Sequence, residues 1–142
     1  MTSESAQAAG AVLVSKDQLF EQADILTIHL VLSGRTRGLV GAADLARMKP
    51  TARLINASRG PIVDEQALID ALRNKQIAGA AIDVFETEPL PTSHPYRTLG
   101  NVLATPHIGY VSQGLYRTFY EDTVSNIRKW LDSQLADASK GT

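Results

Sequence analysis

Polar residues stand where several short apolar segments of the sequence end, and an arginine, a carboxylate and a histidine among them could together do acid–base chemistry on a carboxylic acid. Arg59 directly follows the segment 53–58, the two glutamates of FETEP, Glu86 and Glu88, follow the segment 79–84, and His107 lies in PHIGY after the segment 102–105. An arginine fork binds a carboxylate or a polarised carbonyl at two points. A histidine passes a proton near neutral pH, and a neighbouring carboxylate favours its imidazolium form.

This combination contains no cluster of metal ligands, and it fits the reduction of a 2-oxo acid. The side chains cannot supply a hydride, so a nicotinamide cofactor must do so. Taken singly, each residue has an ordinary explanation: an arginine at a strand end is more often a surface charge, and a histidine after proline is usually structural. Asp83 could equally cap the turn after its segment. The hypothesis of a functional site depends on all of these residues lying at the same edge of one β-sheet.

The elements that would bring them together are visible as alternating patterns. Continuous apolar segments predict buried strands at 25–30, 53–58, 79–84 and 102–105, with AVLV at 11–14 as a weaker fifth. Continuous rather than alternating segments are typical of parallel strands covered on both faces. Helical patterns lie between them, with Ser15 and Asp64 as candidate N-caps. We therefore expect an α/β fold, a parallel sheet with helices on both faces.

In such a sheet, ligands bind at the carboxyl ends of the strands. Arg59, a carboxylate of FETEP and His107 are therefore expected at one edge of the sheet. Gly60 and Pro61 would form a tight exit from the strand and keep Arg59 at that edge, although they also fit an ordinary loop.

The last part of the chain has a different pattern. One long helix is predicted from Gln113 to about Gln134, with an apolar stripe formed by Tyr120, Val124, Ile127 and Leu131. This stripe needs a cover, either from the same domain or from a further domain or second subunit. The chain is predicted to consist of a lead-in at 1–10, which is frayed or the tail of a helix, an α/β part at 11–112, a long helix at 113–135 and a disordered tail at 136–142.

Composition excludes several classes of function. The 142 residues suit one domain, and a net charge of −1 leaves no electrostatic footprint for nucleic acid or for a membrane surface. The absence of cysteine rules out disulfides and thiolate metal sites. The N-terminus has no signal-peptide pattern and no apolar segment approaches the length of a membrane span. We expect a cytoplasmic protein.

The stretches LINASRGPIVDEQAL, DVFETEPLP and NVLATPHIGY resemble the D-isomer-specific 2-hydroxyacid dehydrogenases, and the resemblance covers roughly residues 9–132. It implies half of a doubly wound Rossmann-type sheet, in which residues 11–112 are the distal part of a dinucleotide-binding domain and residues 113–135 are a helix that links it to a substrate domain. It also implies hydride transfer between NAD, with NADP as the alternative, and a small 2-oxo or 2-hydroxy acid. The family further implies a homodimer and no metal.

The resemblance assigns roles to individual residues. Arg59 matches the substrate-binding arginine, His107 the proton donor and Glu88 the carboxylate paired with it. Glu88 and His107 are therefore expected within hydrogen-bond reach or one water apart. Glu86 is the acidic rival, but the family motif places the catalytic carboxylate directly before the proline. Asp83 matches the residue that holds the nicotinamide carboxamide. The full set of matched cofactor-binding positions is Leu30, Val31, Thr36, Ala57, Ser58, Arg59, Asp83, His107 and Gly109.

The sequence departs from the family in one important respect. It contains no G-x-G-x-x-G, and GRTRGLVG at 34–41 has the wrong spacing for a phosphate loop. The helix N-terminus that binds pyrophosphate in this family and the acidic residue that binds ribose are missing together with that loop. The chain alone is therefore expected to bind NAD(H) weakly and to turn over little 2-oxo acid. It fits a part of a longer dehydrogenase, a chain completed by a partner, or a non-catalytic interaction protein like the corepressors that resemble this family.

Overall fold

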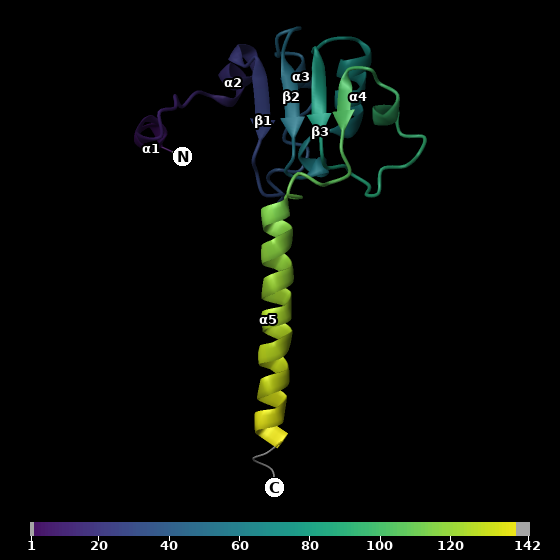
Figure 1. The fold of residues 1–142 in the computed structure, drawn as a ribbon. Coiled ribbons are helices and arrows are strands. Elements are labelled where there is room, and N and C mark those ends of the chain that lie inside the picture. Colours follow the sequence, from purple (N-terminus) through teal and green to yellow (C-terminus); the bar gives the residue numbers. More distant parts are fainter. Residues whose placement is uncertain (1, 139–142) are drawn as a thin grey trace. The chain divides into compact units, whose positions relative to one another are not determined.

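The computed structural model describes residues 2–138, in which short strands alternate with helices. Within these residues one parallel sheet has the strand order β1-β2-β3-β4 (Figure 1). The register places Leu26 beside Leu54, Leu54 beside Ala80, and Ala80 beside Val102. The α/β class with a parallel sheet is confirmed. The strands are β1 Ile25–Ile28, β2 Arg53–Asn56, β3 Gly79–Ile82 and β4 Val102–Ala104.

The weaker fifth strand, predicted at residues 11–14, is wrong. That segment takes no regular structure, and Val12 is 85% exposed. An apolar segment of this length forms a strand only if a neighbouring strand accepts its backbone hydrogen bonds, and none pairs with it here among the described residues. Residues 3–8 form the helix α1, which corresponds to the helical alternative predicted for the lead-in.

The helices begin where the sequence signals them. Ser15 caps α2 by accepting the Gln18 N–H, and Asp64 caps α4 by accepting the Ala67 N–H, so both predicted N-caps are confirmed. Two short 3₁₀ helices, η1 and η2, lie in the loops. The helical elements are α1 Ser3–Ala8, α2 Lys16–Gln22, α3 Ala42–Leu45, η1 Gly60–Ile62, α4 Glu65–Arg73, η2 Pro95–Arg97 and α5 Gln113–Ala138.

One hydrophobic core joins the sheet to the helices. Leu68, Ile69 and Leu72 form the buried face of α4, and Phe20 of α2 and Leu45 of α3 belong to the same cluster. The strands contribute every second residue to this core, among them Leu26, Ile28, Leu54, Ala80 and Ile82. Burial of this shared apolar surface is the main force that holds the strand ends in position.

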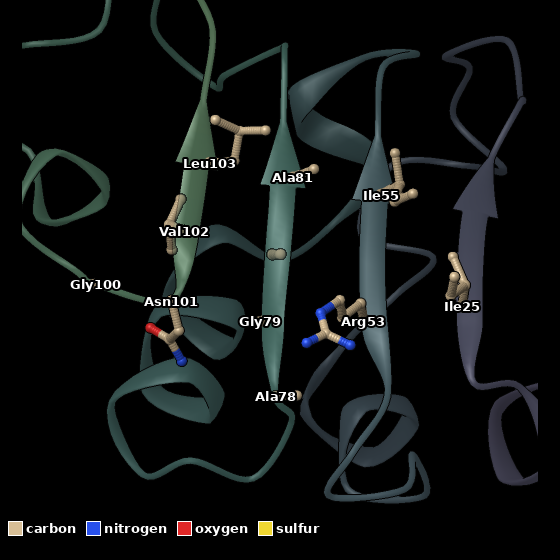
Figure 2. A pocket seen from close by; sticks show the side chains of 11 residues that line it. Ile25, Arg53, Ile55, Ala78, Gly79, Ala81, Gly100, Asn101, Val102 and Leu103 are labelled. Atoms are coloured by element: carbon tan, nitrogen blue, oxygen red, sulfur yellow. The ribbon is translucent and has the colours of Figure 1, made fainter.

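The alternate strand residues point away from that core. Continuous apolar segments predicted burial on both faces, whereas burial alternates along β1 and β2. Figure 2 looks onto the second face, where Arg53, Ile55, Ala81 and Leu103 lie along adjacent strands. Ile25 is 64% exposed and Leu103 is 66% exposed. Successive side chains of a strand point to opposite faces, and the helices α2–α4 share their core with one of these faces. We call the other the open face.

The chain divides into two compact units at His107–Ile108, and each is described by itself. The second unit contains α5, on which Tyr120, Val124, Ile127 and Leu131 are exposed. The predicted disordered tail begins inside this helix, which continues to Ala138, and residues 139–142 lie outside the described part. No helix between residues 2 and 138 is both long and apolar enough to cross a membrane.

Candidate active site

The candidate residues of the first unit follow the carboxyl ends of the strands. Because the strands are parallel, these ends meet at one edge of the sheet (Figure 1). Each of the four strands contributes to the set. Leu30 and Val31 follow β1, Ala57, Ser58 and Arg59 follow β2, Asp83 and Glu88 follow β3, and His107 follows β4.

Glu88 and His107 are in direct contact, as predicted. The His107 Nδ1 atom lies 2.8 Å from Glu88 Oε2, a charge-assisted hydrogen-bond distance. The two residues come from loops after different strands and are 19 positions apart in sequence. The side chains are 37% and 38% exposed, so the pair is accessible to a ligand.

The second oxygen of the Glu88 carboxylate is also held. Phe85 N–H donates to Glu88 Oε1 at 3.0 Å, so the carboxylate is fixed from two sides. The hydrogen bond from His107 and, after it, the one from Phe85 lower the pKa of Glu88 below its ordinary value of 4.5. Glu88 is therefore ionised at neutral pH.

The rival carboxylate, Glu86, has another partner. Arg37 Nη1 donates to Glu86 Oε1 at 3.2 Å, and both side chains are about half exposed. The geometry therefore pairs Glu88, and not Glu86, with the histidine, as the motif predicted.

His107 itself adopts an uncommon backbone conformation. Its φ is +56°, in the left-handed region that histidine enters more readily than most residues. Its N–H donates to Thr105 O at 3.0 Å, which closes a tight turn directly after β4. The imidazole that follows this turn contacts the loop that carries Glu88.

Arg59 leaves β2 through a loop fixed by a residue that sequence reasoning missed. Asn56, only 2% exposed, donates through Nδ2 to Arg59 O at 3.0 Å and accepts Ser58 N–H at 3.1 Å through Oδ1. Ser58 Oγ in turn donates to Ile28 O at 2.6 Å and ties the loop to β1. An asparagine at the end of an apolar strand segment was the available signal, since a buried amide needs several partners.

Gly60 allows the Arg59 loop to lie against the loop that carries Glu88. A Cβ added at Gly60 would lie 2.1 Å from Phe85 C and 2.7 Å from Glu86 N, so no side chain fits. Pro61 follows within the 3₁₀ turn η1 and fixes the direction of the exit. Arg59 is exposed, and its Nη1 donates to Ser58 O at 2.6 Å. No measured contact joins it to Glu88 or His107.

Asp83 directly follows β3, and its side chain is largely buried. It is 8% exposed, and Thr105 Oγ1 donates to its Oδ1 at 2.6 Å. This contact links the ends of β3 and β4, so it also fixes the start of the turn to His107. Thr105 was not predicted to take part, and its place one strand away gave no local signal.

Several predicted cofactor-binding residues lie around one hollow beside β1 and β2. Leu30, Val31, Ser58 and Arg59 line it, together with His29 and Leu32. Thr36 contacts one residue of this lining, since its hydroxyl donates to Val31 O at 2.7 Å. Ala57 is exposed in the same loop as Ser58. Gly109 belongs to the second unit, and its assignment to the cofactor site stays a prediction.

Comparison with known proteins agrees with this geometry. Residues 1–109 match the family model described as D-isomer specific 2-hydroxyacid dehydrogenase, NAD binding domain. The chain is 44% identical over 128 residues to D-3-phosphoglycerate dehydrogenase of Synechocystis sp., covering 90% of this chain and 23% of that one. It is 49% identical over 111 residues to glyoxylate/hydroxypyruvate reductase B of Enterobacter agglomerans, covering 78% and 34%.

Solved structures show the same relationship. A phosphoglycerate oxidoreductase from Vibrio cholerae is 36% identical with a TM-score of 0.83, over 92% of this chain and 42% of that one. A D-isomer specific 2-hydroxyacid dehydrogenase from Xanthobacter autotrophicus, in complex with NADPH, is 47% identical with a TM-score of 0.63, over 65% and 29%. The chain belongs to the D-isomer specific 2-hydroxyacid dehydrogenase family, in its NAD-binding domain. It spans about a quarter to a third of the length of the two curated relatives.

Proposed function

We propose that this chain carries the acid–base pair and the nicotinamide end of the cofactor site of an NAD- or NADP-dependent D-2-hydroxyacid dehydrogenase. The reaction is hydride transfer between the nicotinamide and a small 2-oxo or 2-hydroxy acid. The contact of 2.8 Å between His107 and Glu88 at the carboxyl edge of the sheet carries this proposal. Residues 11–112 would form the cofactor part and residues 113–135 a linking helix.

In this proposal His107 moves the proton. Glu88 engages Nδ1, so Nε2 is the ring nitrogen that would donate to the carbonyl oxygen as it becomes a hydroxyl. Ionised Glu88 stabilises the imidazolium before the transfer and fixes the orientation of the ring. In the reverse direction the neutral ring accepts the hydroxyl proton at the same atom.

Arg59 would bind the carboxylate of the substrate. Its exposed guanidinium can exchange the Ser58 carbonyl for a carboxylate, with which it forms two parallel hydrogen bonds. Binding at two points fixes the orientation of the 2-oxo group, which a lysine at this position would do less well.

The residues present fit part of a nicotinamide cofactor. A hollow beside Leu30, Val31 and Ser58 suits a flat ring, and Asp83 directly after β3 offers an acceptor for a carboxamide. When bound, the cofactor would supply or accept the hydride. This sequence has no G-x-G-x-x-G for the pyrophosphate, so these residues would hold only the nicotinamide end.

The intact pair of Glu88 and His107 favours an enzyme over a non-catalytic interaction protein on the same scaffold, because interaction alone needs no positioned acid. A homodimer and a cytoplasmic location complete the proposal. Apolar side chains exposed on α5, such as Tyr120 and Trp130, would be covered by the second copy.

A chimera tests the proposed function. The matched 111 residues of the Enterobacter reductase are replaced by the corresponding residues of this chain, at 49% identity. We expect reduction of hydroxypyruvate with NADH or NADPH, and a loss of about 10²–10⁴-fold in kcat on His107→Gln, the range for removal of a general acid. Arg73→Lys, at the exposed end of α4, is the control and should leave kcat unchanged.

The 142-residue chain alone is assayed in parallel. It should bind NADH far more weakly than the chimera, because hydrogen bonds to charged groups contribute roughly 1.5–3 kcal/mol each and the pyrophosphate would lack several. A folded chimera that binds NADH but does not reduce hydroxypyruvate would overturn the proposed function.

A further inference from the structure

The loop that carries Glu88 is long and has little regular structure. It runs from Asp83 to Asn101 between β3 and β4, and η2 is its only regular element. Yet Glu88 must be placed to within a fraction of an ångström to keep its contact with His107. The contacts that hold this loop therefore decide the geometry of the pair.

Arg97 folds the loop back onto itself. Its Nε donates to Pro91 O at 2.9 Å and its Nη2 donates to Leu90 O at 2.7 Å. These carbonyls belong to the second and third residues after Glu88. The planar guanidinium fixes both at once, a geometry that the single ammonium of lysine does not reproduce.

His94 attaches the same loop to α4. Its Nδ1 accepts Tyr96 N–H at 3.2 Å, so the proton of the neutral ring must lie on Nε2, which is 3.1 Å from Glu65 Oε1. Tyr96 is 4% exposed and packs against the Phe85 and His94 rings. One end of the loop is thus anchored in the core. The hydrogen bonds of Arg97 to Leu90 O and Pro91 O join this anchored end to the residues that follow Glu88.

We propose that Arg97 is a positioning residue for the Glu88–His107 pair, with His94 as a second anchor. Arg97 acts through the Leu90–Pro91 backbone, and its side-chain hydrogen bonds go to these two carbonyls and not to Glu88 or His107. The inference rests on the acid–base pair of the proposed function. Release of the two carbonyls would let Glu88 drift, and a displacement of about 0.5 Å is enough to lengthen the 2.8 Å contact beyond the usual range for a hydrogen bond.

Nitrogen NMR of the histidine rings measures the contact directly, without any turnover. In the 142-residue chain labelled with ¹⁵N-histidine, we expect the neutral His107 ring to carry its proton on Nδ1, with slow exchange of that proton. Arg97→Lys should shift the ring towards the Nε2–H tautomer and speed the exchange. Arg73→Lys makes the same chemical change outside the loop and should alter neither signal.

A second variant guards against misfolding. His94→Asn keeps a short side chain that can cap Tyr96 N–H but cannot reach Glu65, and should shift the His107 signals in the same direction by a smaller amount. In uniformly ¹⁵N-labelled samples, backbone amide shifts of buried Leu54 and Ile77 report whether each variant keeps the native core.

The outcomes separate the two proposals. If the unmodified chain shows no Nδ1–H signal for His107, the acid–base pair of the proposed function is absent and both proposals fail. If it shows that signal and both variants keep it unchanged with a native core, the pair stands and the positioning role of Arg97 is overturned.

Discussion

The two faces of the sheet differ sharply although their sequences look alike. Leu54 on the covered face is fully buried against α4 and its neighbours, whereas Leu103 on the open face is 66% exposed (Figure 2). Both are leucines in parallel strands of one sheet. The polar contacts that support the site involve residues of the covered face. Asn56 donates to Arg59 O, and Ser58 donates to the carbonyl of buried Ile28. Burial, and not residue type, therefore decides which strand positions fix the site.

The largest expected effect tests this comparison at its centre. Leu54→Ala should lower the free energy of unfolding by about 2–5 kcal/mol, because it removes buried contacts and leaves a cavity. Leu103→Ala, the same change on the open face, should cost less than about 0.5 kcal/mol. Urea unfolding measures both. A cost for Leu103→Ala close to that for Leu54→Ala would mean that the open face is covered in the working protein.

Gly60→Ala is expected to have the next largest effect. The added Cβ would meet backbone atoms of Phe85 and Glu86 at 2.1–2.7 Å, so one of the two loops must move. We expect a loss of about 3 kcal/mol, the upper part of the range for overpacking. Gly34→Ala is the control, since its Cβ would meet nothing within 4 Å. Equal thermal midpoints for the two variants would show that the loops do not need this close approach.

Asn56→Ala addresses the polar support of the covered face. It would leave the Ser58 N–H and the Arg59 carbonyl without their present partner at a largely buried position. We expect a cost of roughly 2 kcal/mol and faster amide exchange in residues 57–60. Hydrogen exchange followed by mass spectrometry measures the local change. Unaltered exchange in this segment would contradict the role assigned to Asn56.

Glu88→Gln should have the smallest effect on stability, and one that depends on pH. The pKa of Glu88 is lowered in the folded state by His107 and Phe85, so its ionised form stabilises the fold above the ordinary value of 4.5. That contribution is lost as the pH falls through the lowered pKa. The variant should therefore lose less stability than the original chain between pH 5 and pH 3. Because the side chain is 38% exposed, the difference should be modest. Identical acid unfolding curves would argue against the contact.

Much of the fold could be predicted because its signals are local. Apolar segments of strand length located all four strands, and Ser15 and Asp64 marked the starts of α2 and α4 correctly. A cap needs only a side-chain oxygen within three residues of a backbone N–H. Both groups can therefore be located from the sequence alone. The segment 11–14 failed because a strand also needs a partner, and pairing is not a local property.

The candidate site divides in the same way. Residue type and position after each strand predicted that a carboxylate of FETEP and His107 would lie at one edge of the sheet, and the family motif chose Glu88 over Glu86. The pairing of Glu86 with Arg37 and the burial of Asn56 could not be foreseen. Those contacts join loops that are far apart in the chain, and a sequence alone does not place one loop against another.

The sequence by itself determined the parallel α/β pattern, the helix starts and the order in which Arg59, Glu88 and His107 follow their strands. Each of these features depends on interactions between residues that are only a few positions apart in the sequence. Only the tertiary structure decided that one face of the sheet is buried, that Gly60 lies against Phe85 and that Asp83 accepts from Thr105. The physical reason is that packing and buried hydrogen bonds select among partners distant in sequence, and that choice is made by the core as a whole.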